Sequence, residues 1–458
     1  MLETKVVPHR DYLFANRANQ KLYLQLTLEP DSKASQTRPK LSVVFVVDTS
    51  GSMREVVTEP TEYTGETKIV EGKEYEVVRG AKSKLDLVNE SVVAILNSQA
   101  LGDDDHLALV RFDDEASVLA PLTEAKHRAR LISAAEKLSE FSGGTQMGAG
   151  LKEALALLEG ASGSKRILLL SDGQTFDAEL VSEVTVALSE AHIPVTAIGV
   201  GGFNAGLLVD TAEKTQGKLI DIVPDTDNPQ PPSVRASELP RAILGDIGSA
   251  ANEVITEIAL TIKTVKDVKV DRITRVHPVQ TEVEVAAPFT LGNAAAGEET
   301  TFIIEFTLPA KQPLKMRLAQ LGLTFNVPGA GYRGEVPPID VLVEFTSDEQ
   351  LASQTNRSVL DYVTGRTLEG IVKRAMIEVD KDRPEAADKL LQEAEMLAAR
   401  VNNTAMTKVL GGARSTLGKT GRLDASATKT LSMGSKTQTL GKKTSVLEEQ
   451  RFRDLTET

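Results

Sequence analysis

The chain has 458 residues, roughly three times the 150 residues typical of one domain, so two or three structural units are expected. Its 52 Lys and Arg residues are outnumbered by 65 Asp and Glu residues. The resulting formal net charge of −13 excludes a chain-wide surface for nucleic acid or anionic membrane, which needs a basic face. There are 0 cysteines, which excludes disulfides, thiolate metal sites and cysteine nucleophiles, and the 5 histidines are too far apart in the sequence to predict a zinc site.

No segment has the composition of a targeting or membrane-spanning element. Residues 1–10 are charged and lack the apolar run of a signal peptide. The most apolar stretches, residues 43–47 and 167–170, are far shorter than the roughly 20 residues of a spanning helix. We therefore expect no membrane span and a cytoplasmic protein.

Residues 1–38 begin the chain with a strand-like segment, residues 22–28, followed by a polar stretch. Between residues 39 and 223, short apolar runs alternate with segments of helical spacing. The expected strands are residues 41–47, 107–112, 167–170, 195–200 and 219–223, and the expected helices are residues 84–101, 124–138, 147–158, 178–191 and 205–215. This alternation predicts an α/β domain with a doubly wound, mostly parallel sheet.

Residues 54–82 interrupt this pattern between the first expected strand and the first expected helix. Within them, residues 67–78 alternate like a β-hairpin with its turn at Glu71-Gly72. The segment is therefore expected to be a hairpin insertion in the α/β domain.

The α/β domain is followed by a linker and by a second set of strands. Residues 224–256 begin proline-rich and end in a helical pattern, and residues 257–346 contain period-two runs separated by Gly and Pro, as in an antiparallel β-sandwich. Because a polar stretch separates residues 22–28 from the first core strand, we expect residues 1–38 to supply strands to the sandwich. The α/β domain is then an insertion within it.

The C-terminal part is expected to hold two helices and a tail. Residues 347–410 have the pattern of a helical hairpin, with a proline at the start of the second helix. Residues 411–458 are rich in Thr, Ser, Gly and Lys, and most of this stretch is basic. Such a composition buries too little apolar area to offset the entropy of ordering, so a disordered tail is expected.

Five polar residues follow two of the expected strands or precede a helix. Asp48, Ser50 and Ser52 lie in an Asp-x-Ser-x-Ser run after the first core strand, Thr145 precedes a helix, and Asp172 follows another core strand. The carboxyl ends of parallel strands share one rim of the sheet, so these side chains can converge there. Two carboxylates and three hydroxyls suit a hard divalent cation, Mg²⁺ above all, with Mn²⁺ or Ca²⁺ as alternatives.

These three motifs resemble the metal-ion-dependent adhesion site of the von Willebrand factor type A family, and the resemblance covers about residues 39–223. The whole layout also looks like the inter-alpha-trypsin inhibitor heavy chain and calcium-activated chloride channel regulator types of that family. The resemblance implies that Ser50, Ser52 and Thr145 are metal ligands, and that Asp48 and Asp172 ligate directly or through water. It also implies a partner protein that presents an Asp or Glu to the metal.

Two further features bear on this site. The starts of the helices near residues 84 and 147 are expected to add positive potential. The insertion at residues 54–82 departs from the family pattern, in which the serine loop runs almost directly into the first helix. It can shape the choice of partner, or its glutamates can cap the cation, and a surface insertion without function is an equal alternative.

The tail carries a repeated Thr-x-Thr-Leu unit, at residues 428–431 and 437–440. Thr428 and Thr437 each have Leu three residues later, which resembles phosphothreonine motifs bound by forkhead-associated domains. Phosphorylation of Thr428, Thr430, Thr437 or Thr439 by a Ser/Thr kinase would create an arginine-pairing group in a basic segment. A low-complexity solubilising tail is the alternative.

Three functions remain open from the sequence. The leading interpretation is a non-enzymatic, cation-dependent protein-binding module that takes part in signalling through its tail. A Mg²⁺-dependent hydrolase or phosphatase with Asp48 as nucleophile is less favoured, because the second residue after it is Ser50 and no carboxyl group is left as general acid. A scaffold with a vestigial metal site is the third.

Overall fold

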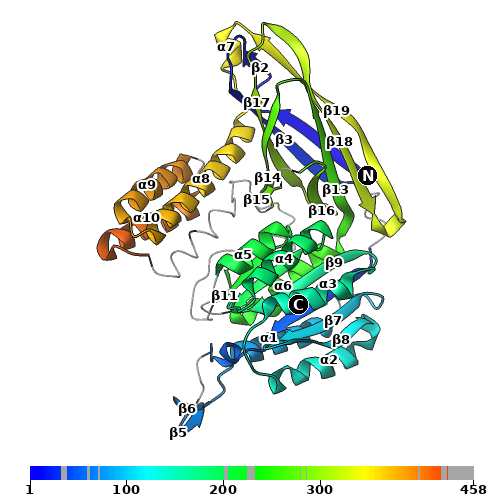
Figure 1. Cartoon of the computed structure of the whole chain (residues 1–458), viewed down its shortest axis with the longest axis vertical. Helices are drawn as coiled ribbons and strands as arrows, with labels where there is room; N and C mark the ends of the chain where they lie inside the picture. The colour runs from blue at the N-terminus through cyan, green and yellow to red at the C-terminus, as the bar shows by residue number, and fades with distance from the viewer. Residues whose placement is uncertain are drawn as a thin grey trace, which may run out of the picture.

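The computed structural model describes residues 1–31, 39–58, 62–70, 73–98, 100–200, 205–223, 233–278, 280–284, 286–400, 403–423 and 431. Their strands form one seven-stranded sheet, two five-stranded sheets and one two-stranded hairpin. Figure 1 shows three parts: an α/β region with helices around the seven-stranded sheet, a group of long strands above it, and a helical unit beside those strands. The predicted fold class, a mostly parallel α/β sheet together with antiparallel sheets and C-terminal helices, is confirmed.

The seven-stranded sheet has the order β12-β11-β10-β9-β4-β7-β8, and its neighbours are parallel except for β7 and β8. Its strands are β4 (Leu41–Asp48), β7 (His106–Phe112), β8 (Ala116–Glu124), β9 (Ser164–Ser171), β10 (Val195–Val200), β11 (Leu219–Val223) and β12 (Ser233–Arg235). Every residue of β4 is buried. Helices cover both faces of the sheet, which explains why the sequence of β4 is apolar without alternation.

Each face of this sheet has its own hydrophobic core. One core contains α1 (Lys84–Leu96), α2 (Arg128–Ala135) and α6 (Leu239–Ala251), and the other contains α3 (Met147–Leu158), α4 (Ala178–Glu190) and α5 (Ala205–Lys214). β4 serves both, because Phe45 lies in the first core and Val44 and Val46 lie in the second. The short 3-10 helices of this region are η2 (Gly51–Arg54), η3 (Ala125–His127), η4 (Glu136–Glu140) and η5 (Ala236–Glu238).

The insertion contains the expected hairpin. β5 (Glu62–Val70) pairs with β6 (Lys73–Arg79) in antiparallel fashion, with Val70 opposite Lys73. Figure 1 shows this hairpin extending away from the seven-stranded sheet.

The remaining strands form two five-stranded sheets, β1-β3-β17-β14-β15 and β16-β13-β18-β19-β2. The strands are β1 (Leu2–Pro8), β2 (Tyr12–Phe14), β3 (Gln20–Pro30), β13 (Glu253–Thr264), β14 (Lys269–His277), β15 (Thr281–Val283), β16 (Phe289–Ala295), β17 (Thr300–Leu308), β18 (Leu314–Val327) and β19 (Tyr332–Thr346), with η6 (Pro328–Ala330) before β19. A single hydrophobic core joins the two sheets as a sandwich. β3 lies between β1 and β17, so the N-terminal strands belong to the sandwich and the α/β region is inserted after them, as predicted.

The C-terminal helices differ from the prediction. Among the residues that the structure describes, four helices follow β19: α7 (Glu349–Ala352), α8 (Arg357–Asp380), α9 (Pro384–Arg400) and α10 (Thr404–Thr420). The prediction of two helices ending at residue 410 is therefore wrong, because a further helix, α10, begins at Thr404. The prediction of disorder from residue 411 is wrong as far as Thr420, where α10 ends. Leu410, Ala413 and Leu417 are buried against α8 and α9, and Arg414 pairs with Asp388 and Glu395, at 2.9 and 2.8 Å.

Among the described residues no helix is both long and apolar enough to cross a membrane.

Candidate functional site

The carboxyl ends of β4 and β9 bring the two predicted carboxylates to one rim. Asp48 ends β4 and Asp172 follows the last residue of β9, and the two strands are adjacent and parallel. Ser50 immediately precedes η2 and Ser52 lies within it. The segment that leads to Thr145 is linked to this loop two residues earlier, where the Gly51 N–H donates to the carbonyl of Gly143 at 3.0 Å.

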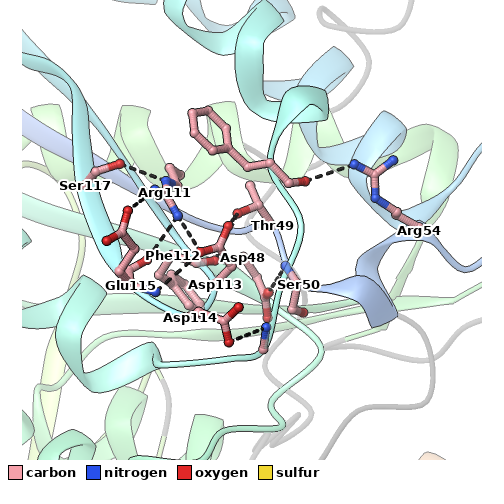
Figure 2. Close-up of polar contacts among 12 residues, drawn as sticks. Asp48, Thr49, Ser50, Arg54, Arg111, Phe112, Asp113, Asp114, Glu115 and Ser117 are labelled. Atoms are coloured by element: carbon pink, nitrogen blue, oxygen red, sulfur yellow. Dashed lines mark hydrogen bonds and ion pairs between the residues drawn. The ribbon is translucent and has the colours of Figure 1, made fainter. Parts of the chain in front are cut away.

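The serine loop is held by Asp48. The Ser50 N–H donates to Asp48 Oδ1 at 2.9 Å, and the Oγ atoms of Ser50 and Ser52 are 3.1 Å apart. Figure 2 shows Asp48 and Ser50 facing each other at this turn. The loop therefore places two hydroxyls side by side and next to a buried carboxylate.

Burial controls the charge of Asp48. The side chain has 0 % exposure, and burial is the largest influence raising the pKa of Asp48 to about 6, with the nearby Asp172 charge adding to it. Hydrogen bonds from Ser171, at 2.6 Å, and from Ser50 act in the opposite direction. The fold thus holds a carboxylate where its negative charge is poorly compensated.

Asp172 is the second buried carboxylate of the rim. It is 1 % exposed, and its Oδ1 has no hydrogen-bond partner. Leaving a buried carboxylate oxygen unpartnered costs free energy, and an oxygen-seeking cation would remove that cost. Within the described part of the chain, no group of three or more His, Cys, Asp or Glu residues could hold a metal. A cation at this rim would therefore depend on hydroxyl oxygens besides Asp48 and Asp172, and the residues present fit that donor set.

Polar contacts of residues that follow β7 fix the loops of the rim. Thr49 Oγ1 donates to Asp113 Oδ2 at 3.2 Å, and Asp113 is paired with the buried Arg111. Asp114 accepts from the Gly144 N–H at 2.9 Å, and a side chain at position 144 would approach the same carboxylate within 2.5 Å. Figure 2 shows Asp113 and Asp114 between the strand ends and the serine loop. These aspartates position the loops, and glycine at 144 permits the close approach.

The helix starts do not add free positive potential. At α3 the N–H groups of Gly148 and Ala149 donate to the Asp177 carboxylate at 3.1 and 3.0 Å. At α1 the side chains of Ser83 and Asp86 form a capping box. An acidic side chain therefore offsets the dipole at both helices, and the expectation of a positive contribution from them is wrong.

A buried lysine that the sequence analysis did not single out lies at the rim. Lys84 is the first residue of α1, its side chain is 4 % exposed, and its Nζ lies 2.7 Å from Glu55 Oε2 and 3.4 Å from Asp172 Oδ2. A lysine in the first turn of a helix opposes the helix dipole. This unfavourable position is visible in the sequence and could have indicated that Lys84 has a specific role.

Phe176 was also missed, and it is the most exposed large apolar side chain at the rim. It is 86 % exposed, its N–H donates to the carbonyl of Thr145 at 2.9 Å, and its ring lies against Gly144. An exposed aromatic ring at a candidate binding site is typical of a protein contact.

The insertion begins and ends at the site. Val56 forms a β-bridge with Ser83, and the Lys84 N–H donates to the carbonyl of Glu55 at 3.0 Å. Among the described residues of the insertion, Glu55 is the glutamate that reaches the rim, and it pairs there with Lys84.

The predicted phosphorylation sites Thr428, Thr430, Thr437 and Thr439 lie outside the described residues.

Residues 43–174 match the von Willebrand factor type A domain family. The chain therefore contains a von Willebrand factor type A (VWA) domain, and the match includes all five predicted site residues.

Solved structures share the fold over nearly the whole chain. A von Willebrand factor type A protein from Catenulispora acidiphila superposes with a TM-score of 0.74 and 16 % identity, covering 95 % of this chain and 96 % of that chain. The ArnB paralog VWA2 from Sulfolobus acidocaldarius superposes with a TM-score of 0.53 and 13 % identity, covering 95 % and 100 %. Identities this low indicate a common fold and nothing about activity.

One curated relative is similar in sequence. The uncharacterized protein YfbK of Escherichia coli (strain K12) is 23 % identical over 209 residues, which are 43 % of this chain and 31 % of that protein. The similarity thus spans about a third of the relative's length.

Proposed function

We propose that this VWA domain, a fold that is typically a protein-binding module, captures an acidic side chain of a partner protein through a divalent cation. Mg²⁺ is the cation that best suits the donor set, with Mn²⁺ or Ca²⁺ as alternatives. The residues that would hold it are Ser50, Ser52 and Thr145, with Asp48 and Asp172 ligating directly or through water.

The observation that carries this proposal is the poorly compensated charge at the rim. Asp172 Oδ1 is buried without a hydrogen-bond partner, and burial raises the pKa of Asp48. Lys84 pairs with Asp172 alone of these two carboxylates, so two buried carboxylates beside a pair of hydroxyls 3.1 Å apart leave negative charge that favours cation binding.

The chemistry of the residues explains why the partner should be acidic. Hydroxyl ligands are neutral, so a divalent cation bound here would keep residual positive charge for a carboxylate oxygen of the partner. Phe176, 86 % exposed beside Thr145, offers an apolar contact next to that carboxylate. The partner surface is therefore expected to combine an Asp or Glu with an apolar patch.

VWA domains are usually non-catalytic, and we propose that this one is too. Ser50 stands where a hydrolase that used Asp48 as nucleophile would need a second carboxyl group. We also propose a relation to the inter-alpha-trypsin inhibitor heavy chain and calcium-activated chloride channel regulator types. The order of the chain supports it, because sandwich strands precede and follow the α/β region in the sequence.

We further propose that a Ser/Thr kinase phosphorylates the tail at Thr428, Thr430, Thr437 or Thr439, and that a forkhead-associated domain then binds it. The repeated Thr-x-Thr-Leu unit supports this signalling role. Leu431, three residues after Thr428, is buried in the core formed by α8, α9 and α10. A domain that contacts this leucine would therefore have to displace it from the helices. Phosphopeptide mass spectrometry on protein from the native host tests the proposal, and full coverage of the tail without phosphate would contradict it.

The cation-dependent function is tested by affinity capture from native lysate. The full chain in Mg²⁺ is expected to retain a partner that the same chain in EDTA, or an Asp48→Ala variant in Mg²⁺, does not retain. A partner captured equally in all three cases would contradict the proposal. Turnover of a generic phosphoester that depends on Asp48 would favour the hydrolase instead.

A further inference from the structure

Lys84 places a fixed positive charge at the candidate metal site. Its Nζ bridges the carboxylates of Glu55 and Asp172, at 2.7 and 3.4 Å. Glu55 is 68 % exposed, whereas Asp172 is buried, so the contact with Asp172 is screened much less by solvent. The lysine therefore compensates part of the charge that a metal ion would otherwise compensate.

The two oxygens of Asp172 face different environments. Oδ2 is the atom within reach of Lys84 Nζ, and Oδ1 is the atom without a hydrogen-bond partner. A cation accepted at Oδ1 would lie close to the ammonium group. The repulsion between the two positive charges would weaken cation binding.

We propose that Lys84 is a resident counter-cation of this site, which neutralises Asp172 in the absence of metal and lowers the affinity for divalent cations. This inference rests on the proposed cation site. The consequence for function is specific: the ammonium takes up part of the negative charge of Asp172, so a bound cation retains more of its own charge for the partner's carboxylate. Lys84 thus lowers the affinity of the site for the metal and strengthens the attraction of the bound metal for an acidic ligand.

The chain offers a matched control two residues earlier. Lys82 pairs with Glu90 at 2.7 Å, and both side chains are exposed, at 45 % and 56 %. Substitution of Lys82 removes one positive charge from the same segment without touching Asp172. Lys84→Arg keeps the charge at the site itself, whereas Lys84→Met removes it and keeps most of the apolar stem.

The test is titration calorimetry of the full chain with Mg²⁺ and Mn²⁺, on wild type, Lys84→Met, Lys84→Arg and Lys82→Met. We expect Lys84→Met to bind Mg²⁺ about tenfold more tightly, since a like charge close to the cation is removed. Lys84→Arg and Lys82→Met should stay within about twofold of wild type, because the first keeps the charge and the second alters only an exposed pair.

Thermal unfolding provides a second readout. In EDTA, Lys84→Met should melt at a lower temperature than wild type, because Asp172 is left buried without a cation, and Mg²⁺ should restore the loss. If this variant does not fold in EDTA, folding upon addition of Mg²⁺ supports the inference, and failure to fold in Mg²⁺ overturns it.

The outcomes separate the inference from the function on which it rests. Mg²⁺ binding by wild type with the same affinity in Lys84→Met overturns the role of Lys84 and leaves the cation site standing. Binding that appears only in Lys84→Met supports the role of Lys84 but overturns the proposed cation-dependent function of the wild-type chain. No binding in either protein overturns both.

Discussion

The two ends of the seven-stranded sheet differ in how the charge of a buried aspartate is compensated. At the amino end, Arg166 of β9 is paired with Glu253 of β13, and Asp246 of α6 lies 3.1 Å from Lys218 Nζ. Burial acts to raise the pKa of Asp246, but the charges of Arg166 and Lys218 outweigh it and hold that pKa below its usual value. At the carboxyl end, burial raises the pKa of Asp48, and Asp172 has Lys84 Nζ 3.4 Å from its Oδ2 and no hydrogen-bond partner at its Oδ1.

We propose that this difference separates charges that stabilise the fold from charges that serve binding. Paired charges at the amino end link the α/β region to the sandwich, since Glu253 also accepts from Asn293 Nδ2 of β16 at 2.8 Å. At the carboxyl end, Asp48 is held by hydrogen bonds and Asp172 shares Lys84 with Glu55, so negative charge remains that a bound cation would compensate. Such an arrangement is consistent with the proposed cation site.

The largest expected effect comes from breaking a pair at the amino end. Arg166→Met leaves Glu253 buried without its cation and should lower the free energy of unfolding by about 3–5 kcal/mol in urea titrations. Arg272→Met is the control, because Arg272 pairs with Glu282 at exposed positions and its loss should cost about 0–1 kcal/mol. Equal losses in the two variants would contradict the structural role of the amino end.

Substitutions at the carboxyl end should instead change the stability little and weaken the capture of the partner. Truncation of the exposed ring in Phe176→Ala is expected to weaken Mg²⁺-dependent capture of the partner about tenfold, as for an aromatic interface residue. Met396→Ala is the control, since Met396 is 63 % exposed on α9, away from the rim. Capture that falls equally in both, or in neither, would remove Phe176 from the proposed surface.

His9 shows how burial acts on a charge far from either end. Burial, with the nearby Arg10 charge adding to it, lowers the pKa of His9 to about 4, from an ordinary value near 6.5. The unfolded chain therefore takes up a proton at higher pH than the folded chain does. Stability should fall as pH decreases from about 6.5 to 4, by up to about 1.4 kcal/mol per pH unit.

Substitution of His9 isolates this slope. His9→Gln should flatten the pH dependence of urea unfolding over that range relative to wild type. If the free energy of unfolding of His9→Gln depended on pH as it does in wild type, burial would not lower the pKa of His9. The same effect of burial on Asp48 would then be in doubt.

The smallest expected change is in the stability of Asp48→Asn. In EDTA near pH 7, this variant should unfold within about 1 kcal/mol of wild type or be more stable, because it removes a poorly compensated charge and keeps an acceptor for the Ser50 N–H. If Asp48→Asn lost as much free energy of unfolding as Arg166→Met, the buried charges at the two ends would both be needed for stability, which would contradict the comparison.

The rim could be predicted from the sequence because topology determines it. Once residues 41–47 and 167–170 are assigned as parallel strands, Asp48 and Asp172 must end on the same edge of the sheet. The contact of Lys84 with Asp172 depends on the packing of α1 against that edge, which no local pattern encodes. Composition likewise concealed α10, because its Thr- and Gly-rich average hides Met406, Leu410, Ala413 and Leu417 at helical spacing.

The most direct test of this account is calorimetric titration of the full chain with Mg²⁺, on wild type, Asp48→Ala and Asp103→Ala. Asp103 is a surface aspartate of the same domain, 78 % exposed, and serves as the control for the loss of one negative charge. The account predicts one-to-one binding by wild type and Asp103→Ala, and none by Asp48→Ala, whose far-ultraviolet circular dichroism should match that of wild type. Unchanged Mg²⁺ affinity in a folded Asp48→Ala variant would contradict the assigned site.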